Sequence, residues 1–220
     1  MQCMENRSKE LLKKIIEVYI ETAKPVGSQC LVEFFNISSA TIRNEMLILE
    51  QAGYITQPHI SAGRIPTIQG YQYYLDELIE IKKIGKKEEE ELKEVIGNNI
   101  RDLAKFLVNK TNLAVIVGFN PHDLYFTGLF NLFSQIEFED YKMVLSMSQV
   151  VDSLEKAINQ IYNEIQGTKV ILGPNNPFSE DFSVVVTSLP QKRILAIIGP
   201  NRMDYSRILG LLNNVVKIVT

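Results

Sequence analysis

The chain has few of the residues that most often mark enzymes, metal sites or disulfide frameworks. Its 220 residues include no tryptophan, two cysteines and two histidines. Cys3 and Cys30 lack metal-ligand spacing, and two cysteines cannot build a disulfide framework. His59 and His122 have no cysteine or carboxylate at ligand spacing, and the common hydrolase, phosphate-loop and metalloprotease motifs are missing. We therefore expect a protein that is not an enzyme and that holds no metal or cofactor.

Long apolar runs and an excess of positive charge are also missing. No apolar run approaches the ~18 residues that span a bilayer, and residues 1–20 are too charged for a secretory signal, so a cytoplasmic location is expected. The formal net charge is -3, and the first 66 residues carry equal numbers of basic and acidic side chains. This balance counts against nucleic-acid binding unless the few cations share one face.

The first third of the chain follows the pattern of a winged helix-turn-helix. Apolar spacing, serine caps and glycine stops predict three helices and a hairpin. Ser28 is the expected cap of the second helix, Ser38 or Ser39 caps the third, and Gly53 ends it. The expected elements span residues 7–22, 28–35, 39–52, 54–58 and 65–67. Such a unit places its third helix in the major groove of DNA and its hairpin against the backbone.

Several polar side chains lie where this unit would meet DNA. Ile42, Met46 and Leu49 share the core-facing side of the third helix. Hydroxyl, guanidinium and amide groups at its start suit base edges, and the hairpin tip suits the backbone or minor groove. The expected base contacts are Ser39, Thr41, Arg43 and Asn44, and the expected backbone contacts are His59, Ser61 and Arg64. The simpler alternatives are a solvated helix arginine for Arg43 and an ordinary turn histidine for His59.

The rest of the chain predicts an α+β body. A helix over 68–83 leads out of the winged unit into a charge-dense hinge. Four β-rich runs and two framing helices follow, at 113–118, 169–172, 182–188, 193–198, 150–165 and 208–219. An antiparallel sheet covered by helices on one face is the simplest arrangement. The expected domains are a DNA-binding domain over 1–84, a linker with a connecting helix over 85–112, and a regulatory domain over 113–220.

Several segments resemble one known family. PVGSQCL, SSATIRNEM, LEQAGYITQPHISAGRIPT and GYQYYLDEL are similar to the N-terminal domain of the heat-inducible transcription repressor HrcA family. GLFNLFSQIEF and IGPNRMDYSRI are similar to segments of its C-terminal half. The resemblance implies a GAF-like fold for the body and repression of chaperone genes through an inverted-repeat operator. It also implies a GroEL-type chaperonin as the partner that keeps the repressor competent.

The chain departs from that family at one point. Family members carry an inserted domain, used for dimerisation, between the first strand of the body and the GLxNLxxxxEF segment. Here the run 113–118 is followed almost at once by 124–130, so residues 119–123 are expected to form a tight link. An inverted repeat is read by a two-fold symmetric protein. We therefore expect a homodimer with a different interface, made by the exposed apolar part of the body or by the 68–83 helix.

Two clusters in the body leave alternatives open. Arg202, Asp204 and Tyr205 start the last helix, and they form either a regulatory surface, toward the wing or a chaperonin, or an ordinary capped helix start. Four phenylalanines, Phe126, Phe130, Phe133 and Phe138, line either a ligand pocket or the core.

The functional hypothesis is a sequence-specific transcriptional repressor of heat-shock genes. The competing hypothesis is a regulator whose body senses a ligand or a protein and whose winged unit mainly contacts protein. Neutral charge and the missing insertion favour this second hypothesis.

Overall fold

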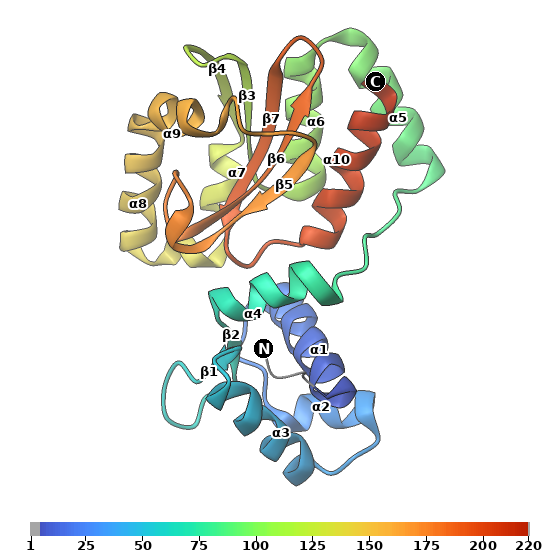
Figure 1. Cartoon of the computed structure of the whole chain (residues 1–220), viewed down its shortest axis with the longest axis vertical. Coiled ribbons are helices and arrows are strands. Elements are labelled where there is room, and N and C mark those ends of the chain that lie inside the picture. The colour runs from blue at the N-terminus through green and yellow to red at the C-terminus, as the bar shows by residue number, and fades with distance from the viewer. Residues whose placement is uncertain (1–4, 220) are drawn as a thin grey trace. The chain divides into compact units, whose positions relative to one another are not determined.

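The computed structural model describes residues 5–219, which divide between Glu80 and Ile81 into two compact units. We call the unit up to Glu80 the head and the unit from Ile81 the body (Figure 1). The domain limits at residues 84 and 112 remain a prediction. Among the described residues, no helix is both long and apolar enough to cross a membrane.

The head is a three-helix unit with a small hairpin and a final helix. Its elements are α1 (Asn6–Thr22), α2 (Ser28–Phe35), α3 (Ser39–Gln51), β1 (Ile55–Thr56), β2 (Ile65–Pro66), α4 (Ile68–Tyr73) and a π-helical turn (Tyr74–Leu78). Leu12, Leu31, Ile42 and Ile55 are among the fully buried side chains that join these elements. This is the expected winged helix-turn-helix, with a shorter hairpin than the sequence predicted.

Four local predictions in the head had different outcomes. Ser38 caps α3, since its hydroxyl accepts a hydrogen bond from the Thr41 backbone N–H at 3.1 Å. Gly53 has a φ of +81°, the expected left-handed stop. Ser28 is not a cap, because it is already the first helical residue and Gly27 holds the cap position. The predicted 68–83 helix is too long, because the backbone becomes extended at Ile79.

The body contains a five-stranded antiparallel sheet. Its strands are β3 (Ala114–Asn120), β4 (Asp123–Thr127), β5 (Thr168–Ile171), β6 (Phe182–Leu189) and β7 (Arg193–Pro200), in the spatial order β4-β3-β7-β6-β5. The three central strands are buried over almost their whole length and mostly apolar, as is typical of strands buried on both faces. This sheet with its covering helices is the expected GAF-like arrangement, so the α+β assignment is confirmed.

Helices cover both faces of the sheet, which corrects the expectation of one covered face. They are α5 (Lys86–Asn98), α6 (Ile100–Thr111), α7 (Leu129–Phe133), a 3-10 turn (Ile136–Glu139), α8 (Tyr141–Asp152), α9 (Leu154–Ile161), a second 3-10 turn (Gly173–Asn175) and α10 (Tyr205–Val219). The successive residues Val184, Val185 and Val186 of β6 are all fully buried, although alternate residues of a strand point to opposite faces. In Figure 1, α6 and α10 lie on one side of the sheet, and α7, α8 and α9 lie on the other.

Two predicted helices are broken by single residues. The connecting helix is interrupted at Asn99, whose backbone is extended and whose side chain accepts hydrogen bonds from the N–H groups of Arg101 and Asp102 at 2.8 and 2.9 Å. The helix expected over 150–165 is interrupted at Ser153, which separates α8 from α9. Helices α7 and α8 were not predicted as separate elements.

The family insertion point is closed by a hairpin. Strands β3 and β4 pair directly, and Asn120 opposes Asp123 across a turn formed by Pro121 and His122. This confirms the predicted tight link over 119–123.

Cys30 is an exposed free thiol, while Cys3 lies outside the described residues.

The body begins with a segment strapped onto α10. The backbone N–H of Lys82 lies 3.0 Å from the Ser206 hydroxyl oxygen, to which it donates. The Lys82 ammonium pairs with Asp204 at 2.9 Å. A Cβ atom on Gly210 would lie 2.0 Å from the Lys82 carbonyl oxygen, so only glycine permits this approach.

Candidate nucleic-acid interface

Helix α3 presents one buried and one exposed side. Ile42, Met46 and Leu49 are buried, as their spacing predicted. Arg43 and Asn44 are exposed in the first two turns. The head therefore presents a guanidinium and an amide near the start of the helix that this type of unit inserts into the major groove.

Arg43 lies beside a hollow that the hairpin shares with α2. The hollow has a volume of about 340 Å³ and is lined by Val26, Gly27, Ser28, Arg43, Met46, Gln57, Ser61, Ala62, Gly63 and Arg64. Two of the expected hairpin contacts, Ser61 and Arg64, thus lie around the same depression as Arg43. The structure brings these three expected site residues together from α3 and from the hairpin, which are separate in sequence.

The charge of the head is mostly paired. Arg7 lies 3.7 Å from Glu45, Lys14 lies 3.8 Å from Glu17, and Arg64 lies 2.9 Å from Glu50. Arg43, by contrast, makes no ion pair with any residue between positions 5 and 219. The equal numbers of acidic and basic residues therefore do not neutralise the exposed end of α3.

The hydroxyls at the start of α3 are used locally. The Ser39 and Ser28 hydroxyls share a hydrogen bond of 2.9 Å, which joins α3 to α2. The Thr41 hydroxyl shares a hydrogen bond of 2.9 Å with that of Ser38. Both Ser39 and Thr41 are half-buried. These two hydroxyl groups stabilise the helix-turn-helix. Because a hydroxyl can both donate and accept, each can form a further hydrogen bond with a ligand.

The hairpin tip is exposed and its base is fixed. His59 and Ser61 are exposed at the tip, and Ile60 between them is 92% exposed. At the base, the Arg64 Nε donates to Glu50 on α3 at 3.0 Å. The backbones of Arg64 and Val26 exchange hydrogen bonds of 2.8 and 2.9 Å. An ion pair to α3 and a single antiparallel β-bridge to the α1–α2 loop therefore set the position of the hairpin.

Some residues of this site were missed by sequence reasoning. Val26 and Glu50 fix the hairpin base, and Gln57 holds its tip by donating to the Ala62 carbonyl at 3.0 Å. Gly63, just before Arg64, did indicate a close approach of the backbone, but the sequence did not show to which partner. A Cβ on Gly63 would lie 2.5 Å from the Val26 backbone, so the glycine serves a close approach within the head.

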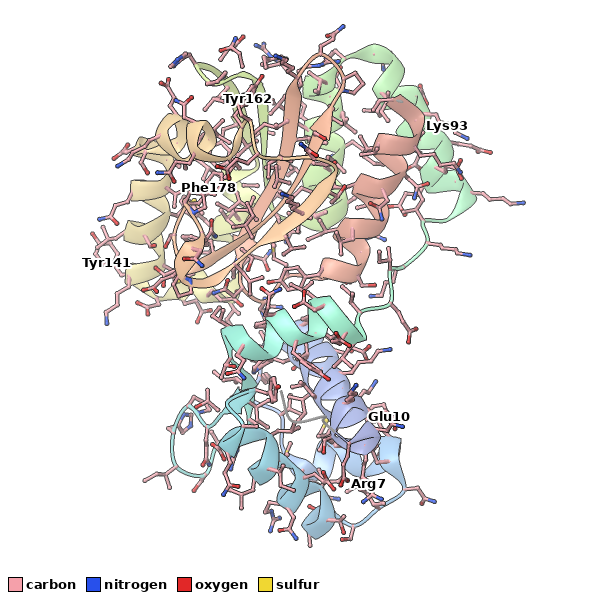
Figure 2. The ribbon with its side chains drawn as sticks, in the orientation of Figure 1. Arg7, Glu10, Lys93, Tyr141, Tyr162 and Phe178 are labelled. Atoms are coloured by element: carbon pink, nitrogen blue, oxygen red, sulfur yellow. The ribbon has the colours of Figure 1, made fainter. Side chains whose placement is uncertain are left out.

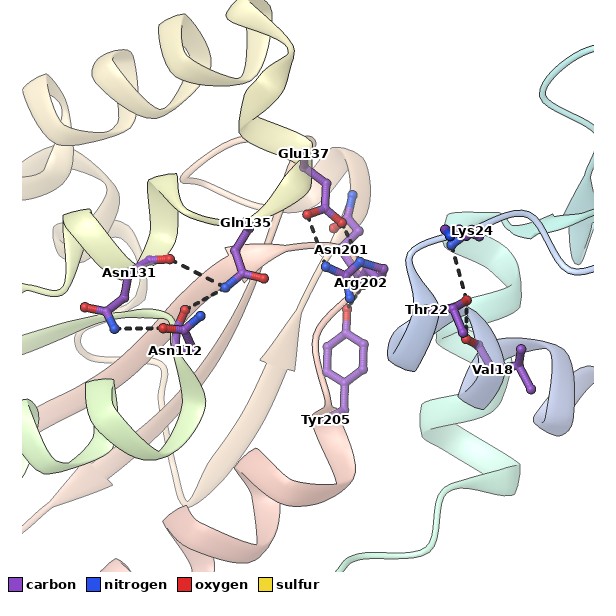
Figure 3. A network of polar contacts seen from close by, with 10 residues as sticks. All are labelled: Val18, Thr22, Lys24, Asn112, Asn131, Gln135, Glu137, Asn201, Arg202 and Tyr205. Atoms are coloured by element: carbon purple, nitrogen blue, oxygen red, sulfur yellow. Dashed lines mark hydrogen bonds and ion pairs between the residues drawn. The ribbon is translucent and has the colours of Figure 1, made fainter.

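The candidate regulatory residues of the body each have a partner within the body. The Arg202 Nε donates to Glu137 at 2.6 Å, and Asp204 accepts from the Arg207 backbone N–H at 3.0 Å. Tyr205 is fully buried and donates to the Asn201 carbonyl at 2.7 Å (Figure 3). Burial raises the pKa of Tyr205 above its usual value, so its hydroxyl stays protonated as a donor.

The four phenylalanines differ in burial, so they do not form a single core cluster. Phe138 is buried and stacks on Phe182, with ring centroids 6.0 Å apart. Phe130 is 84% exposed and Phe133 is 40% exposed. Core filling therefore describes only part of this run, and the surface carries the rest.

Comparisons with known proteins identify the family. The family model described as HrcA protein C terminal domain matches residues 37–209. The heat-inducible transcription repressor HrcA of Carboxydothermus hydrogenoformans is 43% identical over 106 residues, 47% of this chain and 31% of that protein. The repressor of the same name from Mycoplasmoides gallisepticum is 46% identical over 125 residues, 52% of this chain and 36% of that protein. The aligned stretch thus spans about a third of the length of these curated relatives.

One solved structure repeats the fold over the whole length. It is described as the crystal structure of a hypothetical protein and covers 99% of both chains, with a TM-score of 0.71 and 19% identity. At that identity the similarity shows the fold and nothing about function. Since the family model spans most of the sequence, the chain belongs to the HrcA family.

Proposed function

We propose that the chain is a sequence-specific DNA-binding repressor of heat-shock genes. The observation that carries the proposal is Arg43, an exposed guanidinium without an ion pair within residues 5–219, on the helix that a winged unit inserts into the major groove. Arginine can donate two hydrogen bonds to the edge of guanine, and the neighbouring Asn44 can bind adenine in the same way. These two residues read bases, with Ser39 and Thr41 at the edge of the contact.

The hairpin contacts the DNA backbone in this proposal. His59 and Ser61 at the tip face a phosphate or the minor groove. Arg64 has a different part, because its guanidinium is bound to Glu50 and only 18% of its side chain is exposed. Arg64 chiefly positions the hairpin, and a backbone contact from it is secondary.

The remaining parts of the proposal come from the family. The operator is an inverted repeat upstream of chaperone genes, the active species is a homodimer, and a GroEL-type chaperonin supports the folded state in the cytoplasm. Arg202, Asp204 and Tyr205 act in regulation through the stability of the body, since each bonds within it. A body of ordinary marginal stability suits a thermal sensor, because a few kcal/mol separate folded from unfolded populations.

Fluorescence anisotropy with labelled duplexes tests the proposal. The titrations compare an inverted-repeat duplex, a single half-site and a scrambled duplex of equal length at several salt concentrations. We expect preference for the inverted repeat and an affinity that falls as salt rises, because bound cations release counterions from the phosphates. Equal affinity for the inverted-repeat and scrambled duplexes would refute sequence-specific binding.

The Arg64–Glu50 pair gives a separate prediction. Glu50→Ala removes the partner of a mostly buried guanidinium, so we expect the head to lose about 1–3 kcal/mol of stability. If Arg64 mainly positions the hairpin, Arg64→Ala and Glu50→Ala weaken DNA binding to a similar extent, and the double variant is hardly worse than either. Anisotropy on the inverted repeat measures all three. A direct phosphate contact would instead give a much larger loss of DNA affinity for Arg64→Ala than for Glu50→Ala. It would also lower the slope of log affinity against log salt concentration by about one.

The competing function keeps one specific observation in its favour. Leu47 and Ile48, further along α3, are 49% and 54% exposed, and Ile60 stands out at the hairpin tip. Exposed apolar side chains of this kind also suit contact with a protein. If this function holds, the chain shows no DNA preference in the titrations above, and Leu47→Ser abolishes capture of its protein partner.

A further inference from the structure

The segment 129–152 exposes more large apolar side chains than its surroundings. Phe130, Phe133, Ile136, Tyr141, Leu145 and Val151 are between 36% and 84% exposed. They lie on α7, on the 3-10 turn and on α8, of which the last two pack against each other. Figure 2 shows Tyr141 on the outer side of α8. We call these six side chains the α7–α8 surface.

The α7–α8 surface exposes a large apolar area, and Tyr141, Leu145 and Val151 supply the part of it that lies on α8. The exposed parts of six such side chains amount to something on the order of 600 Å². This sum matches the upper end of what a soluble monomer normally exposes in one patch and is below the ~800 Å² that each partner buries in a standard interface, so a contact made by the α8 part is a small one.

From this surface and its charges we infer that α8 packs antiparallel against α8 of a second copy of the chain. Tyr141, Leu145, Ser148 and Asp152 recur at intervals of four, three and four residues, so they form one stripe along the helix. All four are exposed. The Ser148 hydroxyl donates to the Val144 carbonyl at 2.9 Å, so the middle of the stripe can be covered without stranding a donor.

The charges at the two ends of α8 select a second copy over an unrelated partner. Lys142 is exposed near its start and Asp152 at its end, and neither makes an ion pair within the part of the chain that the structure describes. In an antiparallel pair centred near Met147, Lys142 of each copy faces Asp152 of the other. The arrangement is self-complementary, as an isologous two-fold contact requires. The antiparallel helix dipoles also favour it.

The choice of a second copy rests on the proposed function, since an inverted repeat needs a two-fold symmetric reader. The hairpin closure at Pro121 and His122 adds to it, because the chain has no inserted segment there that could supply the contact. A contact of this modest size dimerises weakly in solution. Two half-sites on one operator hold two copies of the chain close together. This raises the effective concentration of each copy for the other and so strengthens the dimer on DNA.

Sedimentation velocity over a concentration series tests the interface with variants of the full chain. Leu145→Glu is expected to raise the dimer dissociation constant at least about tenfold, because a carboxylate is then buried at the centre of the interface. Lys142→Asp and Asp152→Lys are each expected to raise it about three- to tenfold, since each disrupts two symmetry-related pairs. The double variant Lys142→Asp/Asp152→Lys should recover the wild-type value. Lys86→Asp, a charge reversal at an exposed position on α5, away from α7 and α8, is the control and should change nothing.

Binding to a single half-site separates this inference from the proposed function. All variants should bind the half-site like the wild-type chain and differ only on the full inverted repeat. A wild-type chain that stays monomeric on the inverted repeat overturns the dimer, whereas intact half-site binding preserves the DNA-reading role. A dimer unaffected by Leu145→Glu, or charge reversals without mutual rescue, overturns this surface as the interface.

Discussion

Replacement of Arg43 by alanine is expected to weaken binding to the inverted-repeat operator by about thirtyfold or more, since each of the two half-sites loses one contact. A guanidinium that donates two hydrogen bonds to a base contributes ~1–3 kcal/mol of discrimination, and its loss relaxes specificity at one base pair of each half-site. The stability of the head should hardly change, because the Arg43 side chain is exposed and pairs with no described residue. Anisotropy titrations on the operator and on single-base variants measure affinity and specificity together.

Two further variants sharpen that result. Arg43→Lys keeps the charge but loses the two-pronged donor geometry, so it should retain salt-dependent affinity while losing base preference. Lys156→Ala removes an exposed cation from the body and is the control for net charge. If the Arg43→Ala variant kept wild-type affinity and specificity, Arg43 would not contact a base, and the proposal that α3 reads the operator through this residue would be refuted.

Replacement of Gly210 by valine is expected to destabilise the body, although helix propensity alone predicts the opposite. Valine and every other residue except proline have a higher helix propensity than glycine, by up to ~1 kcal/mol for alanine, so the replacement alone should favour α10. A Cβ there would lie 2.0 Å from the Lys82 carbonyl oxygen, so the strap must leave α10. The loss includes the Lys82–Ser206 hydrogen bond and the Lys82–Asp204 pair. Overpacking of this kind costs about 1–3 kcal/mol or more, which corresponds to a melting temperature lower by roughly 2–12 °C.

Gly97 supplies the matched control for that measurement. It lies in α5 of the same body, and a Cβ at this position would meet no atom within 4 Å. Gly97→Ala should therefore leave the melting temperature unchanged or raise it. Differential scanning calorimetry of both variants compares the signs of the two shifts. A melting temperature that rises for both variants would show that the strap is not held against α10.

The sequence predicts well what depends on local spacing. Apolar residues at helical intervals located α1 and α3, and the stop at Gly53 followed from residue chemistry. Residue chemistry left the cap of α3 open between Ser38 and Ser39, and the structure places it at Ser38. The short β-rich runs located the central strands of the sheet, since strands buried on both faces need no alternation of apolar and polar residues. The link over 119–123 was predictable because so few residues separate the first two strands.

What the sequence did not predict depends on contacts between distant residues. The pairing of Arg64 with Glu50 and the approach of Gly63 to Val26 carry no local signature, so Arg64 was expected to be freer than it is. Helices α7 and α8 were missed because several of their apolar residues face outward, which blurs the usual pattern. Asn99 breaks the connecting helix by capping its second half, and an asparagine within an apolar stripe gave little warning.

A footprint on the DNA upstream of the source organism's chaperonin genes tests the central claim most directly. Purified wild-type chain, cleavage by DNase I and a parallel lane with Arg43→Ala are sufficient. The account predicts one protected region that coincides with an inverted repeat, with half-sites on one face of the duplex about one helical turn or a multiple of it apart. Protection should vanish at high salt, and in the Arg43→Ala lane it should be absent at the protein concentration that protects with the wild-type chain. No protection at any concentration, or protection that ignores the inverted repeat, would contradict the assignment of this chain as a sequence-specific repressor.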